Sequence, residues 1–173
     1  MKMVKNGFTL LEMIMAIFVI TVGILGIMSL IQKAMVSTSI SSSRLAAVYL
    51  AQEGIEIVRN TRDVNWLEVG ILANSWDEGL TACGGIGFIA DYNHSYGPDQ
   101  IDPTFPCYAG QPLNIDSDGF YGYSSGIQTK FKRKIIVTTA SDPDIRNVSV
   151  EVSWQDRMMP YSLSVQENLY NWR

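Results

Sequence analysis

A long apolar run near the N-terminus constrains this chain more than any other feature. It covers residues 8–31, and Glu12 is the only charged residue within it. As a helix rising about 1.5 Å per residue it would be about 36 Å long, which exceeds a bilayer core of about 30 Å. Lys2 and Lys5 precede the run, and this basic flank favours a cytoplasmic N-terminus with the remaining chain outside. The sequence therefore predicts a transmembrane helix over residues 8–33.

A cleaved secretory signal peptide is the alternative for this segment. The apolar run is long for the core of a signal peptide, and no clear small-x-small cleavage site is followed by a mature start. The segment 34–43 is rich in Ser and begins with Ala, so it can mimic such a site. This alternative therefore stays open.

The charges are unevenly distributed along the chain. Residues 32–173 carry 11 basic and 16 acidic side chains and a net charge of −5, whereas residues 1–31 have a net charge of +1. An acidic outer portion disfavours bulk electrostatic attraction to nucleic acid. The Tyr, Trp, Val and Ile residues beyond residue 60 exclude a disordered tail. We expect a folded, acidic outer domain for which nucleic acid is not the natural partner.

The start of the apolar run carries a specific pattern. Residues 7–12 read Gly-Phe-Thr-Leu-Leu-Glu and follow a short basic leader. This pattern resembles the prepilin motif of type IV pilins and type II secretion pseudopilins. The resemblance implies a leader peptide over residues 1–7, removed after Gly7 by a prepilin peptidase, and N-methylation of Phe8 as the first mature residue. It also implies that Glu12, the fifth mature residue, is the carboxylate used in subunit assembly.

A carboxylate inside an apolar span needs a physical explanation, because its insertion costs about 2.5–3.5 kcal/mol. One interpretation is that Glu12 stays near the interface and reaches the headgroups. The resemblance supplies another. Cleavage leaves an ammonium group in an apolar setting, and Glu12 of a neighbouring subunit can pair with it. Such a pair would fix the axial register of the subunits, as a single buried polar residue fixes register in coiled coils.

The helical pattern continues beyond the membrane segment. Residues 34–62 contain no Pro and only one Gly. Small and apolar residues recur there at three- and four-residue spacing, which is typical of one buried helix face; they are Ala47, Leu50, Ala51, Gly54 and Val58. We therefore expect residues 34–62 to extend the same helix, which then covers about 8–62.

The composition changes after residue 62. Residues 63–126 are rich in Gly, Asp, Asn, Pro and Ser, which predicts a loop-rich connection with one or two short elements. Residues 127–173 alternate apolar and polar residues, which predicts three antiparallel strands with one apolar face. The helix is the natural cover for that face. The sequence thus predicts an α+β fold: a long N-terminal membrane-spanning helix with a small antiparallel β-sheet head, residues 63–173, packed on its outer half. The pilin resemblance implies the same architecture.

The two cysteines of the chain, Cys83 and Cys107, both lie in the loop-rich segment. Outside the cytoplasm they can form a disulfide, which would close a loop of about 25 residues and contribute about 3 kcal/mol. Two buried free thiols are the alternative. We expect the disulfide.

The head offers little catalytic or metal-binding chemistry. Residues 114–119 resemble the first half of an EF-hand loop, but Ser125 stands where a bidentate Glu belongs, so a polar turn is the better interpretation. His94 is the only histidine, and no nucleophile elbow accompanies it or its neighbours Asp91 and Asp99. We expect no enzymatic activity, catalytic residue, metal site, cofactor or small-molecule substrate.

One basic run stands out in the head, formed by Lys130, Lys132, Arg133 and Lys134. A role in DNA uptake, a task of some pilin-like proteins, is one interpretation of it. A solvated strand face, or an edge strand protected by charge, is the favoured interpretation.

Three further stretches make the resemblance more specific. Residues 44–62, together with 150–154 and 169–172, resemble minor pilins of the PilV (pilus modification) type and the related secretion pseudopilin I. The resemblance implies a minor pilin or pseudopilin, a structural subunit of a type IV pilus or type II secretion pseudopilus. It implies a single-pass protein of the inner or cytoplasmic membrane with its head outside the cytoplasm. The implied partners are the membrane, the prepilin peptidase and, through the N-terminal helix, other pilins.

Two other functions stay open at this point. One is a pilus-tip binding module, for adhesion or DNA uptake, carried on the same helix. The other is a signal-anchored exported protein unrelated to pili, for which no cleavage after Gly7 is expected.

Overall fold

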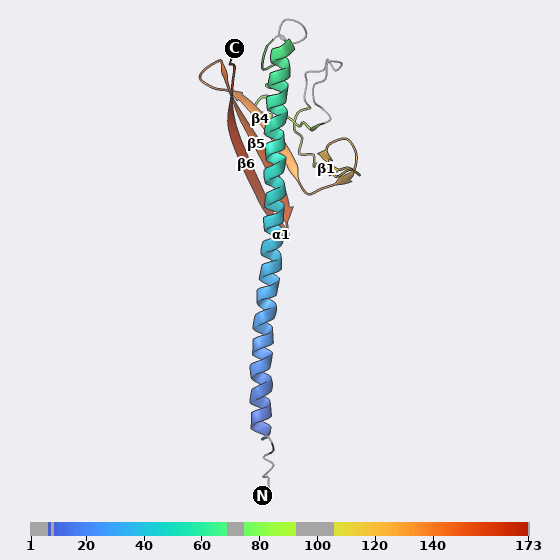
Figure 1. Ribbon diagram of the computed structural model, residues 1–173, viewed down its shortest axis with the longest axis vertical. Helices are drawn as coiled ribbons and strands as arrows, with labels where there is room; N and C mark the ends of the chain where they lie inside the picture. Colours follow the sequence, from blue (N-terminus) through green and yellow to red (C-terminus); the bar gives the residue numbers. More distant parts are fainter. Residues whose placement is uncertain (1–6, 8, 69–74, 93–105, 173) are drawn as a thin grey trace. The chain divides into compact units, whose positions relative to one another are not determined.

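The computed structural model describes residues 7, 9–68, 75–92 and 106–172. Within them, one long α-helix precedes a short 3-10 helix and six β-strands, and the strands form two antiparallel sheets (Figure 1). The chain divides into two compact units, Met1–Ser43 and Arg44–Arg173. The combination of a long apolar N-terminal helix with small antiparallel sheets confirms the predicted α+β fold class.

Helix α1 (Leu10–Glu68) contains 59 residues and continues past the expected end near residue 62. Its last turns have a physical reason to be helical. Neither Gly nor Pro occurs between residues 55 and 68. The buried side chain of Asn65 donates hydrogen bonds to the carbonyl oxygens of Trp76 and Glu78, at 3.2 and 3.0 Å. The segment after the helix therefore packs on these turns and holds them, which the local sequence pattern did not reveal.

In the first unit, α1 exposes apolar side chains along its whole length. The large hydrophobic residues between positions 10 and 31 are 45–79% exposed. The hydroxyl groups of this part bond within the helix: Thr21 Oγ1 donates to the carbonyl oxygen of Ile17 at 2.7 Å, and Ser29 Oγ donates to that of Gly26 at 2.8 Å. These hydroxyls need no water, which is what a lipid environment requires of a polar group.

The larger sheet of the second unit has the strand order β4-β5-β6. Its strands are β4 (Lys132–Thr139), β5 (Ile145–Asp156) and β6 (Met159–Tyr170), and both pairings are antiparallel. Alternate residues of β5 are buried, including Val148 and Val150. This alternation gives the sheet one apolar face, as predicted for residues 127–173.

The apolar face of the sheet packs on the part of α1 that follows Arg44, along which the three strands lie (Figure 1). All five residues predicted to form one helix face are buried: Ala47, Leu50, Ala51, Gly54 and Val58. Gly54 marks the closest approach, because a β-carbon at this position would lie only 2.9 Å from Cγ1 of Val150. The helix is thus the cover that the sheet requires.

A second, smaller sheet occupies the end of the segment predicted to be loop-rich. Its order is β2-β1-β3, with β1 (Asn114–Ile115), β2 (Tyr121–Gly122) and β3 (Ile127–Gln128), and the 3-10 helix η1 (Gly84–Ile86) precedes it. Strands of two residues are too short to show an alternating pattern, so the sequence could not predict their pairing. The turn before β3 requires glycine, since Gly126 has φ of +118° and a β-carbon there would collide with the carbonyl oxygen of Ile115.

Candidate functional site

The first turn of α1 contains the residues expected to act in processing and assembly. Helix α1 begins at Leu10, so Thr9 is its N-cap residue and Glu12 is the third residue of the helix. The backbone N–H of Glu12 donates to Oγ1 of Thr9 at 3.3 Å, and the N–H of Met13 donates to the carbonyl oxygen of Thr9 at 3.2 Å. The spacing Thr-x-x-Glu is that of a capping box. Sequence reasoning missed the role of Thr9, although this spacing is visible in the sequence.

The position of Glu12 in the first turn has an electrostatic consequence. The N-terminus of a helix carries a partial positive charge, so an acidic side chain there is stabilised by about 0.3–1 kcal/mol. The Glu12 side chain is exposed, and therefore accessible to a group outside its own helix. Glu12 can thus start the helix and also accept a cation from another molecule.

Gly7 is exposed and lies just before the capped helix. A β-carbon at this position would meet no atom of the described residues within 4 Å. The described fold therefore does not itself demand glycine at position 7, and a requirement for glycine must come from another molecule. Phe8, the expected methylated residue, lies outside the described residues.

The apolar part of α1 that follows is long enough and apolar enough to cross a membrane. Together with residues 7–12, it forms one continuous N-terminal pattern. Residues 2–28 match the family described as the prokaryotic N-terminal methylation motif. The chain carries this methylation motif. The match supports the type IV pilin and pseudopilin family, whose members are membrane-anchored structural subunits processed by a prepilin peptidase.

The methylation motif covers the expected leader, Glu12 and most of the apolar run, but it ends at residue 28, before the head begins. No curated protein and no solved structure matches the chain.

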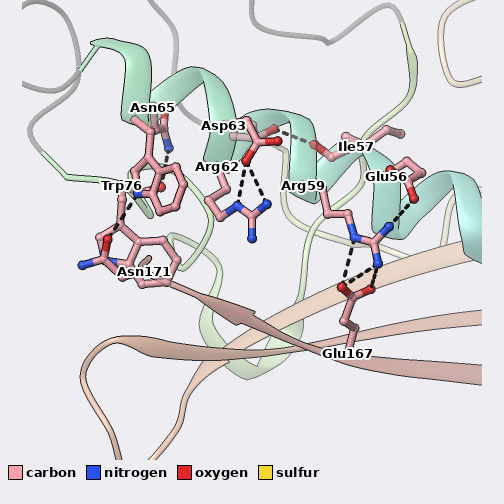
Figure 2. A network of polar contacts seen from close by, with 11 residues as sticks. Glu56, Ile57, Arg59, Arg62, Asp63, Asn65, Trp76, Glu167 and Asn171 are labelled. Carbon is pink, nitrogen blue, oxygen red and sulfur yellow. Dashed lines mark hydrogen bonds and ion pairs between the residues drawn. The ribbon is translucent and has the colours of Figure 1, made fainter. Parts of the chain in front are cut away.

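Arg59 and Glu167 connect α1 to the edge strand β6 (Figure 2). Both guanidinium nitrogens Nη2 and Nε of Arg59 bond to Oε1 of Glu167, at 2.6 and 3.0 Å, and Nη2 also lies 2.6 Å from Oε2. The hydrogen bonding of the Arg59 guanidinium to the Glu167 carboxylate is the main cause that raises the pKa of Arg59 above its usual value. This two-pronged ion pair joins residues 108 positions apart in the sequence, so no local pattern could predict it.

Arg133 corrects the interpretation of the basic run. It was expected on a solvated strand face, but its side chain is fully buried between α1 and the sheet. Its Nη1 donates to the carbonyl oxygen of Leu50 at 3.0 Å, and its Nη2 donates to that of Ala90 at 2.6 Å. Glu53 supplies the charge partner, with Oε2 at 3.2 Å from Nη1. Arg133 thus joins the helix, β4 and the segment before β1.

The lysines around Arg133 are not a free cationic patch either. Nζ of Lys130 lies 3.1 Å from Oδ2 of Asp156, and Nζ of Lys134 lies 2.9 Å from Oε2 of Glu151. Two of the four charges in the run are therefore balanced by acids of β5, and a third is buried in the core. This arrangement removes the main reason to expect DNA binding by the run as a whole.

At the C-terminal end of α1, Arg62 lies against two indole rings that also contact each other, with ring centroids 4.8 Å apart. Its guanidinium carbon is 5.4 Å from the ring centre of Trp66 and 5.2 Å from that of Trp172. Nε1 of Trp66 donates to Oδ1 of Asn171 at 3.2 Å, and Arg62 also pairs with Asp63 at 2.8 Å. These contacts fasten the last turns of the helix to the end of β6.

Cys83 and Cys107 are joined by a disulfide in the structure, with their Cα atoms 5.5 Å apart. The bridge closes a loop over residues 84–106, which begins with η1. Phe88, within that segment, pairs with Ile135 of β4 in an isolated β-bridge, so the enclosed segment also contacts the larger sheet.

The turn at residues 116–119 uses its acid for backbone bonding. Oδ1 of Asp116 accepts the N–H groups of Asp118 and Phe120, both at 2.9 Å, and Oδ2 accepts the hydroxyl of Tyr92 at 2.9 Å. The backbone N–H of Phe120 is the main cause that lowers the pKa of Asp116. Both carboxylate oxygens thus have protein partners, Oδ1 at the turn and Oδ2 at Tyr92, which supports the polar turn expected there.

The remaining catalytic candidates are not brought together by the described residues. His94 and Asp99 lie outside them. Asp91 is buried, and its Oδ2 accepts the N–H of Tyr123 at 2.7 Å. Within residues 7, 9–68, 75–92 and 106–172, no group of three or more His, Cys, Asp or Glu side chains could hold a metal ion.

Proposed function

We propose that this chain is a minor pilin or pseudopilin, a structural subunit assembled into a type IV pilus or a type II secretion pseudopilus. The observation that carries the proposal is the methylation motif over residues 2–28, placed on a capped, exposed, apolar helix. A helix of this kind needs lipid or other apolar helices around it, and a filament core of packed N-terminal helices supplies them.

The minor role rests on features of the head. Residues 44–62, and the ends of the strands at 150–154 and 169–172, are the stretches that resemble the PilV type and pseudopilin I. Most of the described residues 75–92 and 106–131 lie outside helices and strands, which suits a specialised subunit better than one repeated along a whole filament. No metal, cofactor or catalytic residue is part of the proposal.

The assembly step follows from the first turn of α1. Cleavage after Gly7 would create a new ammonium group at Phe8, four residues before Glu12. In an apolar surrounding, the ammonium of an incoming subunit and the Glu12 carboxylate of a neighbour attract each other strongly, because little water screens them. The pair would form only at one axial offset between two helices, so it would set the register of the filament.

The membrane orientation follows from charge and redox chemistry. Lys2 and Lys5 favour a cytoplasmic N-terminus, and the Cys83–Cys107 bridge suits an oxidising compartment. We therefore place the head outside the cytoplasm, with the chain passing from the membrane into the pilus or pseudopilus after processing.

Expression with a prepilin peptidase tests the proposal. Mass spectrometry of the purified chain should show a mature N-terminus at Phe8 carrying one methyl group. The variant Gly7→Val should remain a full-length precursor, because the peptidase site should not accept a large side chain before the cleaved bond. The described fold has room for a β-carbon at position 7, so a steric fault in the fold would not explain the loss of cleavage. Gly23→Ala, a change of the same kind away from the cleavage site, should be processed normally.

A mature methylated chain from Gly7→Val would contradict the proposal. Cleavage near residues 34–43 in place of Gly7 would instead identify a secretory signal peptide, and an uncleaved wild-type chain would identify an unrelated signal-anchored protein.

A further inference from the structure

Strand β6 is an edge of the larger sheet, because β5 is the one strand that pairs with it in the described part of the chain. Its register with β5 runs through all 12 residues without a bulge. Just beyond β6, the N–H of Asn171 donates to the carbonyl oxygen of Asp144 at 2.8 Å. Because successive residues of a strand direct their backbone groups to opposite sides, the odd-numbered residues of β6 bond to β5. The even-numbered residues therefore direct their N–H and carbonyl groups to the open side.

These outward-directed groups form a row of hydrogen-bond donors and acceptors. They belong to exposed residues, and none of them bonds to another backbone group of the described chain; the central ones are Ser162, Ser164, Gln166 and Asn168. Such a row is a ready template for an added strand, and most proteins protect it. The open side of β6 therefore requires either protection or a partner.

Strand β6 lacks most of the usual means of protection. It contains no Lys or Arg, and its one proline, Pro160, stands at the second position. Its one charged residue, Glu167, faces α1 and is neutralised there by Arg59 (Figure 2). This inward-facing carboxylate therefore does not repel an added strand. Residues 161–169 leave about 30 Å of strand open to pairing.

The opposite edge of the sheet, β4, is covered by the chain itself. The N–H of Phe88 donates to the carbonyl oxygen of Ile135 at 2.7 Å, and the N–H of Ile135 donates back at 3.0 Å. The hydroxyl of Tyr123 donates to the carbonyl oxygen of Arg133 at 3.0 Å. The fold thus closes the middle of one edge and leaves the other edge open.

Space for the side chains of an added strand lies between β6 and α1. A groove of about 350 Å³ is lined there by Gln52, Ile55, Glu56, Arg59, Val165 and Glu167. Ile55 and Val165 make part of it apolar. The guanidinium of Arg59 is shared by the carboxylates of Glu56 and Glu167, so one negative charge is in excess. The groove therefore favours a strand that presents an apolar residue and a Lys or Arg on the face toward α1.

A second copy of this chain fits the open edge poorly. Strands β4 and β6 both run antiparallel to β5 and therefore run in the same direction. A copy placed alongside, with its helix parallel, brings its covered β4 to the edge. Two β6 strands paired antiparallel about a two-fold axis would reverse one of the helices, which anchoring in one membrane forbids. The geometry thus favours a strand from a different protein.

We propose that β6 accepts an extended strand from a different subunit of the filament, bonded to the backbone of residues 162–168 with a basic side chain beside Glu56. This inference rests on the proposed function, which brings other subunits alongside this one. Pairing of this kind gains affinity from backbone hydrogen bonds and selectivity from the side chains that enter the groove. The open edge thus serves as a docking strand of the head.

Peptide binding to the full, purified chain in micelles tests the edge. The probe is a dye-labelled peptide, Thr-Val-Thr-Val-Thr-Lys-Thr-Val-Thr, whose Val and Lys side chains share one face of an extended strand. Fluorescence anisotropy should show saturable binding, at least about fivefold tighter than that of the same peptide with Glu in place of Lys. Exchange of the Ser164 and Gln166 amides should slow at least about tenfold on binding, whereas that of Val165, already bonded to β5, should not change.

A proline on the edge separates backbone pairing from contact through side chains. Gln166→Pro removes an outward N–H and keeps the bonds of the neighbouring residues to β5, so proline is tolerated at such a position. It should weaken binding of the Lys peptide at least about tenfold, because a ladder bond is lost and the ring obstructs the edge. Gln166→Thr keeps the N–H and should bind like wild type. If circular dichroism shows that Gln166→Pro is unfolded, amide exchange in the wild-type chain decides. Absence of saturable binding, or unchanged exchange of Ser164 and Gln166, would overturn the proposal.

Filament assembly in the host cell tests the same edge in its proposed setting. Gln166→Pro should be cut after Gly7 and reach the membrane like Gln166→Thr, but it should be depleted from sheared filaments. If the wild-type chain is not cut, the proposed function fails. If Gln166→Pro is cut and enters filaments like Gln166→Thr, only the edge contact fails. Disulfide-linked dimers of Gln166→Cys in the membrane would assign the edge to a second copy and would also overturn the proposal.

Discussion

Arg133 of the edge strand β4 donates a hydrogen bond to the carbonyl oxygen of Leu50 in α1, 3.0 Å away. The acceptor lies inside α1, so the arginine bonds to a carbonyl that is already part of the helix. A cation without exposed surface is stabilised here by two carbonyl oxygens and by Glu53, which is itself partly exposed. The head is therefore built around a buried charge rather than around apolar packing alone.

Replacing Arg133 tests the importance of this charge. Arg133→Met should reduce the free energy of unfolding by about 3 kcal/mol, the lower end of the range for breaking a buried ion pair, since Glu53 can still reach water. Chemical denaturation of the full chain in micelles measures the change. Lys132→Met, at the neighbouring exposed position, should change stability by no more than about 0.5 kcal/mol. Equal effects of the two changes would show that Arg133 is not a structural centre.

Gly54 should resist substitution for a steric reason. In Gly54→Ala the new methyl group would meet Val150 Cγ1 at 2.9 Å, and such overpacking costs about 1–3 kcal/mol. The gain in helix propensity, about 1 kcal/mol at most, offsets only part of it. Adding Val150→Ala should recover some of the loss that arises from the clash. Thermal unfolding followed by circular dichroism provides the measurement, and a single Gly54→Ala variant more stable than wild type would contradict the close packing.

Thr9 should contribute to the start of the helix. Thr9→Ala removes the Oγ1 acceptor for the Glu12 N–H, and loss of an N-cap typically costs about 1 kcal/mol. We expect faster hydrogen exchange of the amides at residues 10–13 in micelles, whereas Thr9→Ser should exchange like wild type. Unchanged exchange in Thr9→Ala would mean that the cap does not hold the first turn.

The disulfide gives a prediction with two independent measurements. Native exported protein should be two hydrogens lighter by mass spectrometry than its reduced form, because one S–S bond replaces two thiols. Cys83→Ser with Cys107→Ser should lower the free energy of unfolding by about 3 kcal/mol. Alkylation of both cysteines in native protein without prior reduction would exclude the bridge.

Glu12 should affect insertion and assembly in opposite directions. Glu12→Leu removes a desolvation cost of a few kcal/mol in the membrane. It would also leave the ammonium of a neighbour without its carboxylate, and breaking such a buried pair costs about 3–5 kcal/mol. Cleaved variant should therefore accumulate in membranes and decline in sheared filaments, by quantitative immunoblot of both fractions. Glu12→Asp, which keeps the charge, is the matched comparison. Normal incorporation of Glu12→Leu into filaments would show that Glu12 is only an interfacial residue.

The larger elements could be predicted because their patterns are long. Helix α1 shows an apolar face over several turns, and β5 alternates over most of its length. The strands of the small sheet could not be predicted, since a strand of two residues such as Asn114–Ile115 is too short to show an alternation of apolar and polar residues. Arg59 and Glu167 lie 108 positions apart, and their pairing depends on the tertiary fold alone.

Two errors of sequence reasoning are more instructive. Alternation through Phe131, Ile135 and Val137 places Arg133 on the buried face of its strand, but its charge suggested the surface. The alternation of the strand predicted the burial of Arg133 correctly, whereas its charge did not. The folded chain places carbonyl oxygens around the guanidinium, and the sequence alone does not reveal them. Thr9 is the second case, because the sequence pattern suggested a role in assembly for Glu12 and none for Thr9. A role of Glu12 in assembly does not explain why α1 starts at Leu10, whereas the capping hydroxyl of Thr9 does.

The contacts between α1 and the sheet have a mechanical consequence. Leu50 meets Arg133, Gly54 meets Val150 and Arg59 meets Glu167, so the attachments follow one another along the helix. A pull along the helix axis loads all of them at once, in shear, whereas a pull at right angles would open them one after another. In the proposed filament, a subunit pulled by its helix would thus be loaded in the direction in which these attachments share the force.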